Sequence, residues 1–125
     1  MRNSYRLRFA AAIAIVIAGA ATPSSAHSFP EQETPSAGAT VAAPPAVTIR
    51  YDAPIEGLFD SLQVLDAAGH DQSAGPPKVS GDGLELSVPV KSLAPGDYTV
   101  KWRVVCIDTH HTEGSYSFTV NTASQ

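Results

Sequence analysis

Apolar and polar residues alternate along the stretch from Gly96 to Cys106. An extended chain places every second side chain on the same face, so this alternation predicts a strand with one apolar face. The same pattern returns from Ser115 to Val120. Two antiparallel strands are therefore predicted on either side of a loop that runs from Asp108 to Glu113. The apolar face of the first strand comprises Tyr98, Val100, Trp102, Val104 and Cys106.

Shorter runs of the same kind precede this pair of strands. They cover Ala46–Asp52, Ser61–Asp66, Lys78–Ser80 and Gly83–Val88. The Gly81-Asp82-Gly83 turn between the last two is typical of a hairpin. No stretch after residue 27 has convincing helical spacing, and no strand is predicted in the Pro- and Ala-rich segment from His27 to Pro45. The fold class predicted is all-β, an immunoglobulin-like Greek-key sandwich or barrel of about seven short strands.

The first 26 residues have the three parts of a secretory signal. Three arginines precede an apolar run of 13 residues from Phe9 to Ala21, and small residues follow at Ser24 and Ala26. A helix that crosses a bilayer needs roughly 20 residues, so the run is expected to be cleaved rather than to anchor the protein. Cleavage is expected after Ala26, with a site near Ala20 or Ala21 as the alternative. The interpretation is a signal peptide at 1–26, export of the remaining chain, and one domain at 27–125.

Asp108 and His110 are the first candidate metal ligands. Residues two apart in an extended chain share a face and lie about 6.5 to 7 Å apart, so the tips of these side chains can converge on one ion. A carboxylate oxygen and an imidazole nitrogen suit Cu(II), Ni(II) or Zn(II). Two ligands alone make a weak site, and the alternative is a solvated turn in which the aspartate bonds to the local backbone.

Cleavage after Ala26 would make His27 the first residue of the exported protein. A terminal histidine offers two nitrogen donors, its α-amine and its imidazole Nδ1, and these can form a chelate ring on one ion. Together with Asp108 and His110, the donor set would be three nitrogens and one oxygen, a combination that favours Cu(II). Phe29 is expected to pack into the end of the barrel while His27 reaches the loop.

The sequence resembles the CopC family of periplasmic copper-resistance proteins, and the resemblance covers nearly all of the chain after the signal. It implies one Cu(II) per chain, bound by His27, Asp108 and His110. It also implies a role in copper tolerance or uptake, with an inner-membrane copper transporter of the CopD type as partner. The stretches that carry the resemblance are a histidine at the expected new N-terminus and residues 34–49, 52–57, 93–105 and 114–120.

Two departures from the family pattern bear on the site. The family loop reads Asp-Gly-His, whereas Thr109 stands between Asp108 and His110 here. Threonine adopts a positive φ only at a cost, so a differently shaped turn is expected. Some members of the family also have a methionine-rich Cu(I) site. The only methionine of this chain is Met1, which would leave with the signal, so a thioether site is excluded.

Charge and cysteine content limit the partners. Removal of residues 1–26 leaves five basic residues against twelve acidic ones, a formal charge of −7. Nucleic acid and anionic membrane surfaces are therefore unfavourable partners. A monomer is expected. One cysteine excludes an internal disulfide. Cys106 is interpreted as a small buried residue, with a soft Cu(I) ligand as the alternative.

The two other histidines after residue 27 are less favoured as metal ligands. His70 follows Gly69 in a turn and is expected to be solvated, and His111 is expected to point away from His110 because adjacent residues of an extended chain face opposite sides.

No catalytic base is evident, so the main hypothesis is a copper carrier without enzymatic activity. The alternatives are an immunoglobulin-like structural or interaction module and, less favoured, a copper-dependent oxidative enzyme. In an oxidative enzyme, an Asp108 ligand would occupy the coordination position on copper that oxygen needs.

Overall fold

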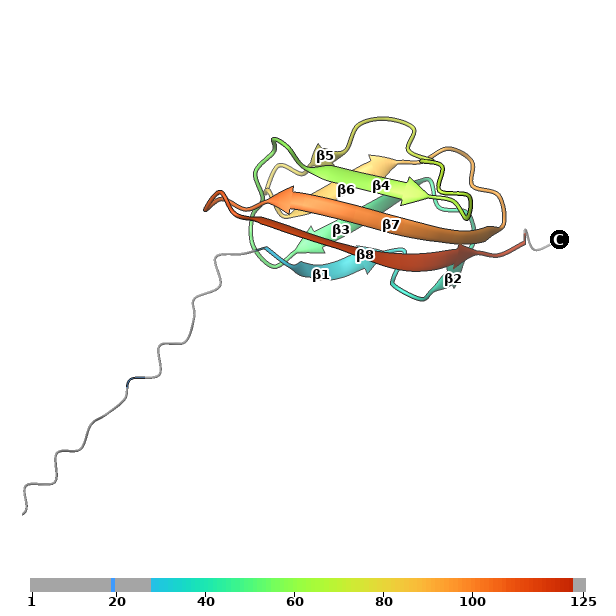
Figure 1. Cartoon of the computed structure of the whole chain (residues 1–125), viewed down its shortest axis with the longest axis horizontal. Helices are drawn as coiled ribbons and strands as arrows, with labels where there is room; N and C mark the ends of the chain where they lie inside the picture. Colours follow the sequence, from blue (N-terminus) through green and yellow to red (C-terminus); the bar gives the residue numbers. More distant parts are fainter. Residues whose placement is uncertain (1–18, 20–27, 123–125) are drawn as a thin grey trace, which may run out of the picture.

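The computed structural model describes Gly19 and residues 28–122, and it contains two four-stranded β-sheets (Figure 1). One sheet has the order β1-β3-β6-β5, with β1 (Pro30–Thr34), β3 (Ala46–Tyr51), β6 (Glu85–Pro89) and β5 (Lys78–Val79). The other has the order β2-β8-β7-β4, with β2 (Thr40–Val41), β8 (His111–Val120), β7 (Gly96–Val105) and β4 (Ser61–Leu65). The prediction of an all-β sandwich is confirmed.

The core lies between the two sheets and is built from the alternating positions that the sequence indicated. Val100 and Val104 of β7 are fully buried, and Trp102 between them is 8% exposed. The ring of Trp102 meets Tyr51 of β3 edge-on, with centroids 5.6 Å apart and planes at 73°. Aromatic pairs in such arrangements contribute roughly 0.5–1.5 kcal/mol beyond the burial of their area. The contact joins the two sheets near the end of the sandwich that carries the candidate site.

Two strands occur where the sequence predicted none. β1 is an antiparallel edge strand beside β3, with Thr34 opposite Thr48, and β2 is a two-residue strand parallel to the end of β8. Neither strand has the alternating apolar pattern, because β1 is largely exposed and β2 is very short. The sandwich therefore has eight strands among the described residues rather than about seven. In the same part of the chain, no helix has the length and apolar character needed to cross a bilayer.

The exposure of Phe29 corrects another expectation. Phe29 is 48% exposed rather than packed into the end of the barrel. The N–H of Phe29 donates to Asp52 Oδ1 (2.9 Å), and the carbonyl of Phe29 accepts from the N–H of Asp52 (2.9 Å). Ser28, which is fully buried, takes the inward position instead. Neighbouring residues of an extended chain face opposite sides, so burial of Ser28 turns the phenylalanine outward.

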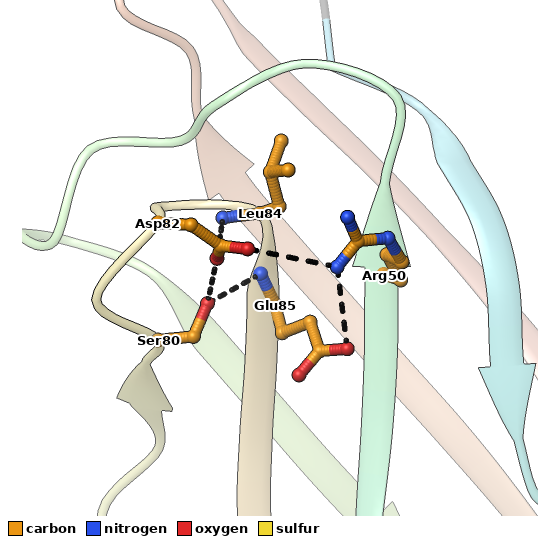
Figure 2. A network of polar contacts seen from close by, with 5 residues as sticks. All are labelled: Arg50, Ser80, Asp82, Leu84 and Glu85. Carbon is orange, nitrogen blue, oxygen red and sulfur yellow. Dashed lines mark hydrogen bonds and ion pairs between the residues drawn. The ribbon is translucent and has the colours of Figure 1, made fainter.

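The predicted hairpin around residues 80–84 is confirmed, and a polar network holds it beside β3 (Figure 2). Arg50 Nη1 lies 3.4 Å from Glu85 Oε1 and 3.7 Å from Asp82 Oδ2. Asp82 Oδ1 accepts from the hydroxyl of Ser80 and from the N–H of Leu84. The Ser80 hydroxyl is the main cause of a lowered pKa at Asp82. The network fixes a turn that contacts the loop after β3.

Candidate metal centre

A tight turn joins β7 to β8 and carries the two candidate ligands. The N–H of Cys106 donates to the carbonyl of His110 (2.7 Å), and the N–H of Thr109 donates to the carbonyl of Cys106 (2.9 Å). The predicted loop from Asp108 to Glu113 lies too far along the chain, because β7 ends at Val105 and β8 begins at His111, which pairs with Val105. Thr109 has a φ of 74°. Thr109 therefore has the left-handed backbone conformation that glycine would adopt freely, and the two hydrogen bonds of the turn hold it there.

Asp108 and His110 contact each other in this turn. Asp108 Oδ2 lies 3.2 Å from His110 Nδ1, and Asp108 Oδ1 accepts from the N–H of His110 at 3.1 Å. The side chain of Asp108 is 29% exposed and that of His110 is 70% exposed. The predicted convergence of an acid and an imidazole on one side of the chain is present. The backbone hydrogen bond from His110 to Asp108 is the one that an aspartate turn contains.

Ser28 attaches the N-terminal segment directly to this turn. Its N–H donates to Cys106 Sγ (3.2 Å), and its carbonyl accepts from the hydroxyl of Thr112 (2.7 Å). Its own hydroxyl donates to the carbonyl of Pro54 (3.1 Å). The third predicted ligand, His27, lies outside the described residues. The residue that follows His27 in the chain is nevertheless fixed between Cys106 and Thr112, on either side of the turn.

Cys106 and Thr112 therefore act as a clamp for the entering chain. Cys106 is fully buried, which confirms its interpretation as a small interior residue, and its sulfur accepts a hydrogen bond from Ser28. Thr112 is 8% exposed although it is polar. Sequence reasoning missed Ser28 and Thr112. The one available signal was the threonine, which stands in the inward register of β8 together with Phe118.

The loop from Asp52 to Asp60 supports the turn from the other side. The N–H of Glu56 donates to the carbonyl of Val105 (2.8 Å), and Asp60 Oδ1 accepts from the N–H of Val105 (2.9 Å). Burial raises the pKa of Asp60 above its ordinary value, against the lowering effect of the Val105 N–H. Asp60 Oδ2 is buried without a hydrogen-bond partner among the described residues. The end of β7 is thereby anchored on both sides.

The remaining histidines lie apart from this arrangement. His70 is 79% exposed, and its Nδ1 lies 3.7 Å from Asp66 Oδ2 in the turn after β4. That turn belongs to the opposite end of the sandwich, since Leu65 pairs with Thr99 near the start of β7. The backbone N–H of His70 is the main cause of a lowered pKa at Asp66. His111 is exposed at the first position of β8.

The described residues do not supply a complete metal site. Over residues 28–122, no group of three or more His, Cys, Asp or Glu side chains is arranged to hold one ion. Asp108 and His110 together offer one carboxylate and one imidazole. Tetragonal Cu(II) coordination by nitrogen and oxygen needs further donors. They would have to come from the segment that enters the fold at Ser28, or from outside the protein.

Known proteins share both the sequence pattern and the fold. The CopC domain model matches residues 30–121. Protein YobA of Escherichia coli (strain K12) is 37% identical over 113 residues, which cover 87% of this chain and 91% of that protein. Copper resistance protein C of Xanthomonas campestris pv. juglandis is 30% identical over 125 residues, covering 93% and 98%. The crystal structure of CopC from Methylosinus trichosporium OB3b is similar with a TM-score of 0.73 at 36% identity, over 79% of this chain and 98% of that one.

Proposed function

Because the chain belongs to the CopC domain family, we propose that it is an exported copper-binding protein that acts in copper resistance or copper import. One observation carries the proposal beyond the family match. Ser28 is bonded to Cys106 and Thr112, so the chain enters the sandwich beside the turn that carries Asp108 and His110. Consecutive Cα atoms lie about 3.8 Å apart, so a ligand directly before Ser28 would have only a short distance to span to this turn.

The proposed site holds one Cu(II) per chain. Its donors are the α-amine and imidazole of His27, a carboxylate oxygen of Asp108 and an imidazole nitrogen of His110. Three nitrogens and one oxygen suit the tetragonal geometry of Cu(II), which also binds such donors more tightly than the other divalent first-row metals. The amine exists only after cleavage following Ala26, because an intact leader would turn that nitrogen into an amide. Processing is therefore part of the site.

The proposed setting is the periplasm, where residues 27–125 would act as one monomeric domain. The copper ion is cargo rather than a catalytic group, and the partner proposed to exchange it is an inner-membrane transporter of the CopD type. A binding site for cargo needs ligands that release the ion. A turn at the surface, with His110 70% exposed, is open to such a partner.

The N-terminal chelate is tested by adding a single glycine before His27 of the mature protein. Titration with Cu(II) in competition with a chelator should show one tightly bound equivalent for the native start, with a nitrogen-rich electron paramagnetic resonance spectrum. The added glycine displaces the amine from the imidazole, and the affinity should fall at least 100-fold. His70→Ala is the matched control and should leave the affinity unchanged.

An unchanged affinity in the glycine-extended protein would show that the terminal chelate is wrong. Weak binding by the native start as well would favour the structural or interaction module. Consumption of oxygen in the presence of copper, a reductant and a polysaccharide would favour the oxidative enzyme. Mass spectrometry of the exported protein determines whether the chain begins at His27.

A further inference from the structure

The large exposed hydrophobic side chains of residues 28–122 all come from segments at one end of the sandwich. These segments are the residue directly before β1, the loop between β3 and β4, and the turn between β7 and β8, and the chain around them lies at the left in Figure 1. This is the end that carries Asp108 and His110. The exposed fractions are 48% for Phe29, 67% for Leu58, 86% for Phe59 and 60% for Ile107.

The loop that presents Leu58 and Phe59 is fixed at both ends. The N–H of Glu56 and the carboxylate of Asp60 both bond to the backbone of Val105, at 2.8 and 2.9 Å. Ile55 also forms a β-bridge with Cys106. Residues 57–59 are thus held as a short arch next to the end of β7 and the turn that contains Ile107.

Phe59 has a φ of 64°, a backbone conformation that bulky residues rarely adopt. Residues persist in such conformations only where the surrounding structure holds them, and they concentrate at functional sites. The ring is nevertheless almost entirely in water. These side chains are therefore exposed on a loop whose backbone is held in place, and large apolar groups exposed at one end of a domain are typical of an interaction surface.

The charge of this end restricts the occupant. Asp52, Glu56, Asp60 and Asp108 belong to the same loop and turn, and residues 28–122 contain twelve acidic residues against five basic ones. A second copy of the chain would bring like charges together, and an anionic lipid surface would repel the same groups. The complementary surface is a protein with an apolar pocket bordered by lysine or arginine side chains.

We infer that Leu58, Phe59 and Ile107 are the docking surface through which a membrane-bound copper transporter with such a pocket approaches Asp108 and His110. The inference rests on the proposed copper function and names the contact surface for it. Docking at these side chains would place the partner next to the proposed site, so copper could pass between proteins without release into bulk water. The apolar groups supply affinity, and the acidic groups supply attraction that salt weakens.

The test compares the mature protein with the double variant Leu58→Ser/Phe59→Ser. Binding to the CopD-type transporter in lipid nanodiscs is measured by biolayer interferometry, with and without copper, at low and high NaCl. The double variant should bind at least tenfold more weakly, while its Cu(II) affinity stays within twofold of the native value. The control is Ala67→Ser/Ala68→Ser in the exposed turn after β4, which should bind the transporter as the native protein does.

Equal transporter binding by the native protein and the Leu58/Phe59 double variant would overturn the docking surface and leave the copper site standing. If the native protein fails to bind Cu(II) but binds the transporter more tightly than the Leu58/Phe59 double variant does, the proposed copper function alone would be overturned. Two direct probes exclude the other occupants. Binding to phosphatidylglycerol vesicles, or self-association by sedimentation that the double variant abolishes, would overturn the assignment of a protein partner.

Discussion

At the scale of single residues, the candidate site depends on residues that have no chemistry of their own toward a metal. Ser28 contributes two backbone bonds that connect the entering chain to Cys106 and Thr112. Thr109 contributes a left-handed backbone conformation that lets the turn close between Cys106 and His110. The ligand pair is therefore positioned by its neighbours. The main conformational cost of this arrangement is the positive φ of Thr109.

Thr109→Gly should stabilise the protein. An L-residue in the left-handed region costs roughly 1–2 kcal/mol, and glycine removes this strain while losing part of the gain to its greater freedom in the unfolded chain. The expected increase in the free energy of unfolding is about 0.5–1 kcal/mol, measured by urea denaturation. Thr99→Gly, in the middle of β7, is the control and should instead destabilise. A loss of stability in Thr109→Gly would mean that the threonine side chain makes compensating contacts.

At the scale of elements, the β7–β8 ladder carries the turn and is held by one close packing arrangement. Gly114 of β8 lies opposite Trp102 of β7. A Cβ at Gly114 would lie 2.7 and 2.9 Å from two atoms of the Trp102 ring, well inside normal contact distance. Trp102 in turn contacts Tyr51 of the other sheet. The absence of a side chain at position 114 thus permits the aromatic contact that joins the sheets.

Gly114→Ala should therefore destabilise the protein by about 1–3 kcal/mol, the usual cost of forcing an extra methyl group into a packed site. Urea denaturation followed by the fluorescence of Trp102, the only tryptophan of the chain, measures this loss. Ser115→Ala, at the exposed neighbouring position, should change stability by less than about 0.5 kcal/mol. Circular dichroism should show that Trp102→Phe/Gly114→Ala recovers part of the loss. No loss in Gly114→Ala would mean that the ring moves freely.

At the scale of the whole molecule, residues far apart in the sequence meet at one end of the sandwich. Ser28 bonds to Cys106 and Thr112, 78 and 84 positions later in the chain. The 52–60 loop supports the same turn through Val105. A copper ion bound by His27, Asp108 and His110 would cross-link the start of the exported chain to the turn between β7 and β8. It would therefore bind the folded state in preference to the unfolded one.

Copper should therefore raise the melting temperature of the mature protein. At a free Cu(II) concentration 100 times the dissociation constant, linkage contributes about 2.7 kcal/mol. For a domain of this size, each kcal/mol shifts the midpoint by roughly 4–8 °C, so a rise on the order of 10 °C is expected in a thermal scan. A chelator should reverse the shift. At the same copper concentration, the protein with glycine before His27 should show a much smaller rise, and an equal rise would place the copper elsewhere.

The alternation of side chains was sufficient to predict the principal strands. β3, β4, β6, β7 and β8 all bury one face against the core, and a buried face leaves a period of two in the sequence. β1 and β2 left no such signal. β1 forms because the edge of β3 offers unpaired backbone groups, and β2 because the end of β8 does. Pairing of this kind depends on the neighbouring strand rather than on the residues of the new strand.

The sequence by itself determined the all-β class, the close approach of Asp108 and His110, and the burial of Cys106, because these follow from local spacing and from the apolar character of alternate positions. Only the tertiary structure decided that the chain enters at Ser28 between Cys106 and Thr112, and that Phe29 faces solvent. Those outcomes depend on hydrogen bonds between residues that lie dozens of positions apart. Such bonds leave no periodic trace in the chain, since their donors and acceptors are ordinary backbone and hydroxyl groups that meet only when the two sheets close.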